Sequence, residues 1–148
     1  APGARKLSES PGGSKGQELV FALARQGVLG GRMVVELVED PTLAAAPPST
    51  WLGRLQQRLA DEGLDLAWSW SGMAINLPHL PGKACLYQGR ASRAGRDAEC
   101  QALFWSDGRR VLTLWLAGAG QLSNLPFWLV NRRAFNLACA GLRSTAGQ

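Results

Sequence analysis

The chain has 148 residues, of which 46% are hydrophobic and 18% are charged. This length and composition are typical of one globular domain and exclude a wholly disordered chain. Sixteen Lys and Arg residues against eleven Asp and Glu residues give a formal net charge of +5. That charge permits contact with nucleic acid, an anionic membrane or an acidic protein, and it does not select among them. No apolar run approaches the about 18 residues of a membrane span, so no transmembrane segment is expected.

Gly, Pro, Ser and charged residues dominate positions 1–16, so we expect a flexible N-terminal arm followed by a single domain over 17–148. Beyond the arm, apolar residues recur at helical spacing in some stretches and at strand spacing in others. Gly and Pro separate these stretches, as they do at helix ends and in turns. The predicted helices are 18–28, 51–62 and 125–140, and the predicted strands are 32–38, 64–70, 73–77, 84–88 and the two halves of 98–116.

The stretch 98–116, AECQALFWSDGRRVLTLWL, carries two apolar runs joined by Asp107-Gly108, the strongest short-range signal for a hairpin. A two-residue turn would pair Phe104 with Val111. Side chains alternate along each strand, and here both resulting faces are apolar. A hairpin with one solvent-exposed face would carry polar residues on that face. We therefore expect both faces of this hairpin to be covered, one by a helix and the other by more protein or a ligand. One face carries Cys100, Ala102, Phe104, Val111, Thr113 and Trp115, and the other carries Leu103, Trp105, Leu112, Leu114 and Leu116.

The cysteines and the one histidine do not form a metal-ligand pattern. Cys85, Cys100 and Cys139 are widely spaced, and His79 adds no cluster, so we expect no metal site and no cofactor. Buried free thiols in a reducing compartment such as the cytoplasm are favoured over a disulfide between Cys85 and Cys100. The sequence begins at Ala1 rather than Met, which is compatible with a removed targeting segment.

Candidate catalytic groups are sparse. No acidic or nucleophilic residue stands at the sequence spacing of a catalytic motif from His79. Glu36 and Glu99 would form an acid/base pair only if both faced one cavity. We therefore expect a domain without catalytic activity.

Arginines gather in three stretches and are candidates for contact with an anionic group, an acidic partner or a nucleic-acid backbone. The first stretch, 89–97, predicts an exposed loop, the second follows the hairpin turn, and the third lies in the C-terminal helix. Because the loop and the turn both end strands, the first two stretches would form one basic end of the sheet. In order, these residues are Arg90, Arg93 and Arg96, then Arg109 and Arg110, then Arg132 and Arg133.

Short connections favour antiparallel pairing, so the element order predicts an α+β fold. We expect an antiparallel sheet of five to six strands, a long C-terminal helix packed on one face, and two further helices near the N-terminus. This order is also compatible with a helix-grip fold, in which a curved sheet wraps the terminal helix around an apolar cavity. The tail LPFWLVNRRAF, residues 125–135, is similar to the end of START-type lipid-binding domains, with different spacing beyond Asn131.

Large apolar side chains are the candidates for a ligand site or an interface, because Trp and Arg are enriched at binding hot spots. They are Trp68, Trp70, Trp105, Leu112, Trp115, Trp128 and Phe135.

The first functional hypothesis is a protein-interaction or self-association module that uses an apolar sheet face rimmed by Arg. It predicts that Trp105 and Leu112 are exposed in the monomer. The second is a carrier of an apolar, lipid-like ligand in a cavity between the sheet and the C-terminal helix. It predicts a cavity lined by Trp68, Trp70, Trp115 and Phe135. The third is a nucleic-acid-binding domain, in which Trp105 stacks on a base and arginines contact phosphates.

Overall fold

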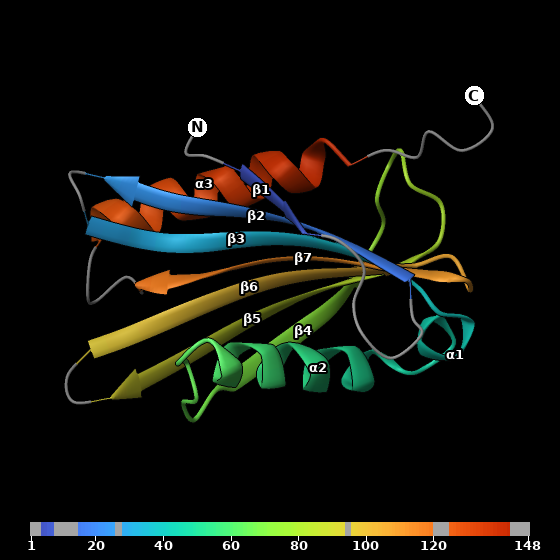
Figure 1. Ribbon diagram of the computed structural model, residues 1–148, viewed down its shortest axis with the longest axis horizontal. Coiled ribbons are helices and arrows are strands. Elements are labelled where there is room, and N and C mark those ends of the chain that lie inside the picture. The colour runs from blue at the N-terminus through green and yellow to red at the C-terminus, as the bar shows by residue number, and fades with distance from the viewer. Residues whose placement is uncertain (1–3, 8–14, 26–27, 94–95, 120–124, 143–148) are drawn as a thin grey trace.

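A computed structural model of the protein describes residues 4–7, 15–25, 28–93, 96–119 and 125–142, with side chains described within 32–92, 97–118, 129 and 132–142. In these residues, seven strands form one antiparallel sheet in the order β1-β2-β3-β7-β6-β5-β4 (Figure 1). The α+β class with an antiparallel sheet is therefore shown, with more strands than expected. The strands are β1 (Ala4–Leu7), β2 (Lys15–Arg25), β3 (Val28–Glu39), β4 (Ser69–Ile75), β5 (Lys83–Arg93), β6 (Arg96–Ser106) and β7 (Arg110–Ala119), and the helices are α1 (Pro41–Ala44), α2 (Pro48–Asp61) and α3 (Leu125–Ala140).

Helices α2 and α3 pack on opposite faces of the sheet, which gives a three-layer arrangement (Figure 1). Trp51 and Leu59 of α2 are buried in one cluster with Phe104 and Trp115 of the sheet. On the other face, Phe135 of α3 is buried against sheet residues that include Leu103 and Leu114. Both faces of the β6–β7 hairpin are thus covered, as its two apolar faces predict.

The second face is covered by more than a helix. At about 1.5 Å per residue, α3 is roughly 24 Å long, whereas an 11-residue strand spans about 36 Å. The terminal helix has the predicted bounds, Leu125–Ala140, but at this length it does not cover the full length of the strands. Leu77 and Leu80 of the β4–β5 connection, together with Leu142, pack around Trp105 where α3 ends.

The predicted N-terminal helix over 18–28 is wrong. Lys15–Arg25 forms β2, which pairs with β3 from Lys15↔Glu39 to Arg25↔Val28. Its sequence carries two periodicities at once, because Leu19, Phe21 and Leu23 alternate while Val20 and Ala22 fill the positions between them. Pairing with a neighbouring strand decides such ambiguous stretches more strongly than local propensity does. Residues Ala4–Leu7, within the expected arm, form β1 beside β2.

The β6–β7 turn is longer than the predicted two residues. Phe104 pairs with Thr113 rather than with Val111, so the register is shifted by two. The Asp107 carboxylate accepts hydrogen bonds from the backbone N–H groups of Arg109 at 2.9 Å and Arg110 at 2.8 Å, and Gly108 takes a φ of 92°. These bonds hold four residues in the turn. A shift of two leaves every side chain on its predicted face, because strand side chains alternate with period two.

The predicted loop over 89–97 is wrong as well. Strand β5 continues to Arg93 and β6 begins at Arg96, so this stretch is the β5–β6 hairpin. Its turn and the β6–β7 turn lie at opposite ends of β6, about 36 Å apart for 11 extended residues. The arginines of the two stretches therefore do not form one basic end.

Strand β4 replaces the two predicted strands at 64–70 and 73–77. It pairs with β5, and two cross-strand pairs match an aromatic ring with a glycine, Trp70 with Gly89 and Tyr87 with Gly72. In each pair the ring lies over the glycine, where a Cβ atom would collide with it. Trp68 stacks on Trp70 with ring centroids 5.5 Å apart.

Candidate binding site

The structure separates the large apolar residues that the sequence grouped. Trp115 is buried beneath α2, and Phe135 is buried on the opposite face. One cavity between the sheet and the C-terminal helix therefore cannot be lined by both, and that prediction is wrong. Trp68 and Trp70 are half-buried at the β4–β5 end of the sheet. The Trp128 side chain lies outside the described residues.

Trp105 is not an exposed interface residue. It is 3% exposed, its indole N–H donates to the carbonyl of Pro81 at 3.2 Å, and the Arg110 guanidinium lies 5.7 Å from its ring centre. Leu112, its cross-strand partner, is half-buried. The exposure that the interface hypothesis predicts for Trp105 is therefore wrong, because the β4–β5 connection folds over it.

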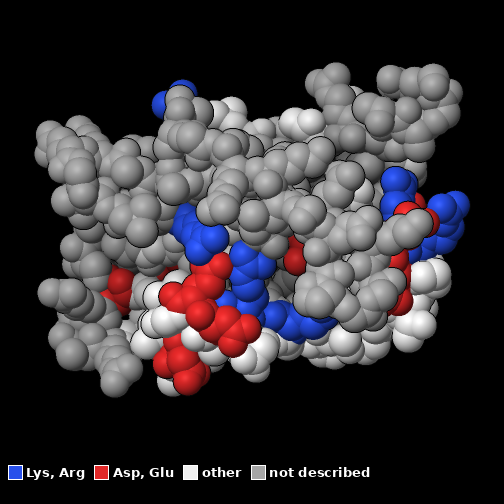
Figure 2. All heavy atoms as spheres, in the orientation of Figure 1, with Lys and Arg blue, Asp and Glu red and all other residues white. Residues whose placement is uncertain are grey.

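The described arginines are dispersed, and several are paired with acids. Arg110 contacts Asp107 at 2.8 Å, and Arg109 contacts Glu39 at 3.4 Å. On the face of the molecule drawn in Figure 2, Lys and Arg side chains are interleaved with Asp and Glu side chains. Arg90 is exposed at the other end of the sheet, beside Trp70. Arg132 and Arg133 are exposed on α3, and the side chains of Arg93 and Arg96 lie outside the described residues.

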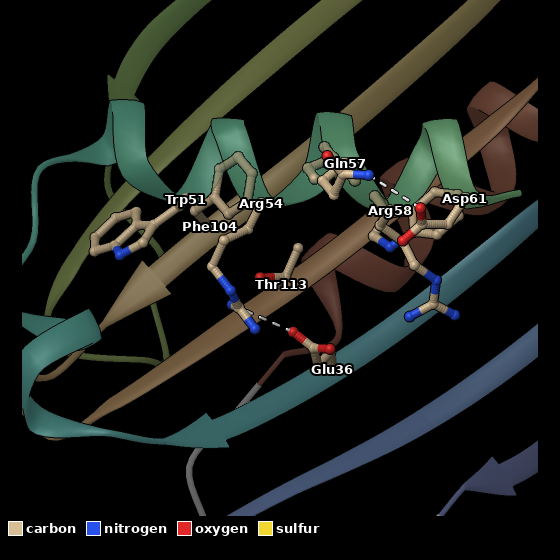
Figure 3. Close-up of a pocket in the computed structure, with 10 residues that line it drawn as sticks. Glu36, Trp51, Arg54, Gln57, Arg58, Asp61, Phe104 and Thr113 are labelled. Atoms are coloured by element: carbon tan, nitrogen blue, oxygen red, sulfur yellow. Dashed lines mark hydrogen bonds and ion pairs between the residues drawn. The ribbon is translucent and has the colours of Figure 1, made fainter. Parts of the chain in front are cut away.

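One pocket lies between α2 and strands β3 and β7, with a volume of about 260 Å³. Figure 3 shows Arg54 reaching from α2 toward Glu36 of β3, with Thr113 beside this pair. The guanidinium and the carboxylate are 3.6 Å apart. Phe104 and Trp51 are also among the pocket residues, and both are buried.

Charges around this α2 pocket are balanced by neighbours. Glu62 accepts from Arg58 at 2.9 Å and from Arg32 at 2.6 Å, and Arg58 lies 5.9 Å from the ring centre of Trp115. The hypothetical acid/base pair of Glu36 and Glu99 is wrong, because Glu36 lies on the α2 face and Glu99 on the α3 face. The glutamates at this pocket, Glu36 and Glu62, are thus held in ion pairs with arginines and are not arranged as an acid/base pair.

A much larger groove opens at the end of the sheet that carries the β6–β7 turn, and we call it the end groove. Its volume is about 1090 Å³. Except for Asn76, Lys83, Ser106 and Asp107, its lining residues are nonpolar, and most of them are Ala, Pro or Gly. The lining comes from residues 44–48, Trp51, 74–76, 81–85 and 106–108.

Hydrogen bonds hold the walls of the end groove in place. Ser106 Oγ donates to the carbonyl of Ala44 at 2.9 Å and accepts from the N–H of Gly108 at 3.1 Å. Asp40 caps α1 by accepting from two N–H groups of its first turn, and its own N–H donates to the carbonyl of Arg109 at 3.0 Å. The Trp51 indole N–H donates to the carbonyl of Leu43 at 2.8 Å. The groove is thus built into the fold.

Sequence reasoning missed this groove. The segment that forms one wall, AAAPP at 44–48, lies between the predicted strand 32–38 and the predicted helix 51–62, and its only local signal is the prolines, which are typical of turns and loops. The other walls come from segments distant in the sequence, which no local pattern brings together.

The described thiols are free. Cys85 pairs with Phe104, whereas Cys100 pairs with Gly89, so the two cysteines are offset along the hairpin and cannot form the disulfide considered above. Burial raises the pKa of the Cys85 thiol, which lines the end groove, and keeps it protonated at neutral pH.

Across the described ranges, His, Cys, Asp and Glu side chains form no group of three that could hold a metal ion. In that same part of the chain, no helix is long and apolar enough to cross a membrane.

Comparisons with known proteins show the fold and nothing finer. No family model matches the sequence, and a search of curated proteins gives no match. The chain is similar to the crystal structure of PA94, a Pseudomonas aeruginosa protein of unknown function, with a TM-score of 0.55. The likeness covers 86% of this chain and 82% of that chain at 19% sequence identity.

Proposed function

We propose that the protein is a non-catalytic interaction module that binds an apolar segment of a partner protein in its end groove. The observation that carries this proposal is the groove itself. Its walls are mostly nonpolar, its volume is about 1090 Å³, and hydrogen bonds from Ser106 and Trp51 fix its shape. Preformed apolar concavities bind ligands without the cost of ordering the site.

The size and position of the end groove favour a polypeptide over a small molecule. Its volume of about 1090 Å³ lies at the upper end of the usual range of about 300–1,000 Å³ for small-molecule pockets. Residues 74–76 of its lining include the end of β4, the strand at the border of the sheet, so a bound segment has room to continue past the sheet. Small side chains at Ala45, Ala46 and Gly82 leave the main chain within reach of an extended partner.

Other surfaces support a binding function less well. The apolar faces of the hairpin, which the sequence hypothesis assigns to a partner, are occupied by α2, α3 and the β4–β5 connection. For nucleic acid, a shared basic patch would be needed, and the arginines of the two turns lie at opposite ends of β6. Burial of the Cys85 thiol also argues against a nucleophile in the groove.

A random-peptide display selection tests this proposal. Wild-type protein is used as bait, and selected peptides are then titrated against Ala45→Arg, which fills the groove from an exposed position. Ala140→Arg, an exposed position on α3, is the matched control. We expect apolar peptides whose affinity falls at least about tenfold with Ala45→Arg and is unchanged with Ala140→Arg.

The same variants distinguish the alternative of an apolar-ligand carrier. Nile red serves as the small apolar probe. If no peptide is enriched but Nile red binds to the wild type and not to Ala45→Arg, the groove carries small apolar molecules and the interaction proposal is wrong. If the selected peptides bind Ala45→Arg as well as the wild type, the end groove is not their site.

A further inference from the structure

The two edges of the sheet are protected to different extents. Strand β1, at one edge, has four residues, ARKL, of which Arg5 and Lys6 are cationic. Strand β4, at the other edge, has seven residues, SWSGMAI, and none is charged or a proline. Short length and charged side chains are the usual means by which an edge strand avoids pairing with another chain. Only β1 has them.

Strand β4 is also regular and sterically open. Its pairing with β5 runs from Ser69↔Arg90 to Ile75↔Ala84 without a bulge. The Trp70 ring lies over Gly89 of β5, toward the middle of the sheet rather than across the edge. Met73 is 61% exposed, although it is a large apolar side chain. Beside β4, no further strand is present among the described strands.

We propose that two copies of the chain associate by antiparallel pairing of their β4 strands, which joins the two sheets into one. A two-fold axis at Gly72 places Trp70 opposite Ala74 and Ser71 opposite Met73 of the second copy. Each pair joins a larger residue with a smaller one, and no charge faces a like charge. A second copy is thus a complementary occupant, even though the whole chain carries a net charge of +5.

The strength of this pairing follows from its size. Seven residues per strand make a contact smaller than a standard interface of about 1,600 Å². The dimer therefore dissociates on dilution. Ala74 and Ile75 belong both to β4 and to the lining of the end groove, but Ala45→Arg tests the groove and the Met73 variants test the strand pairing, so the two proposals fail separately.

Mass measurement by light scattering with size-exclusion chromatography, over a concentration series, tests the pairing. We expect wild-type protein to move from the 15.8 kDa chain mass toward twice that mass as concentration rises. Met73→Lys introduces cations at diagonal positions about 7–8 Å apart across the new strand pair, and Met73→Glu introduces anions there. Each variant alone is expected to remain at the single-chain mass.

Mixing these two variants supplies the decisive arm. Opposite charges now face each other across β4, so the mixture is expected to regain the double mass. Leu137→Lys is the matched control, because Leu137 is 65% exposed on α3, and it is expected to associate like the wild type. Far-UV circular dichroism establishes that each variant is folded. A wild type that stays at the single-chain mass throughout the series, or Met73→Lys that still doubles its mass, overturns the proposal.

Discussion

Substitution of Gly89 by Ala tests the aromatic–glycine pairing that fixes β4 against β5. A Cβ atom at Gly89 would lie 2.5 Å from Cζ3 and 2.6 Å from Cε3 of Trp70, well inside van der Waals contact. The indole is a rigid ring, so the whole side chain must move away from the sheet and from its stack with Trp68. Overpacking of this kind destabilises a protein by about 1–3 kcal/mol.

The matched control is the same substitution at Gly53. That residue lies within α2, and a Cβ atom there would have nothing within 4 Å. Replacing a glycine in a helix interior by alanine stabilises by about 0.5–1 kcal/mol. One added methyl group is therefore expected to have opposite effects at Gly89 and Gly53.

Urea unfolding followed by far-UV circular dichroism measures both changes. In a Trp70→Ala background the collision is gone, so Gly89→Ala should lose its cost, with a coupling free energy of about 1–3 kcal/mol between the two sites. If Gly89→Ala is as stable as the wild type, or if its cost persists without the Trp70 ring, the ring does not rest on this glycine.

Further expectations concern a turn, the core and a thiol. Partial burial raises the Asp107 pKa, but the turn N–H groups and the Arg110 guanidinium outweigh it and lower that pKa, so wild type should exceed Asp107→Asn in stability at neutral pH. In urea titrations this advantage should shrink as pH falls from about 3.9, the unfolded-state pKa, and vanish below the lowered folded-state pKa; an advantage that persists in stronger acid contradicts this. Leu59→Ala, at a fully buried position, should cost about 2–5 kcal/mol in thermal or urea unfolding, against about 0.5 or less for exposed Leu137→Ala; equal costs would place Leu59 outside the core. Burial raises the pKa of Cys139 to about 12, so iodoacetamide should label this thiol more slowly in native than in urea-unfolded protein at pH 8. Mass spectrometry of the labelled peptide measures both rates, and equal rates would contradict the burial of Cys139.

The β6–β7 hairpin shows why part of the fold could be predicted from sequence. Its two apolar faces were predicted correctly from a register that is wrong by two residues. Face assignment depends only on whether a shift is odd or even, whereas the exact pairing depends on how Asp107 bonds to the turn N–H groups. The strand faces are encoded along the chain, and the turn geometry is not.

Errors in the prediction arose where long-range pairing decides the structure. Residues 18–28 satisfy a helical pattern, yet pairing with β1 and β3 on either side makes residues 18–25 part of strand β2. Arginines that end two different elements were expected to meet, but a full strand separates them. The end groove combines the AAAPP segment with three distant segments, so its existence follows from topology that local patterns do not contain.

The most direct test of the end groove as a binding site is a nuclear magnetic resonance titration with a selected peptide. We expect the largest methyl and amide shift changes on Ala44–Ala46, Ala74 and Ala84, and no change at residues of α3 such as Ala138. Shift changes centred on α3, or none at saturating peptide, would contradict it.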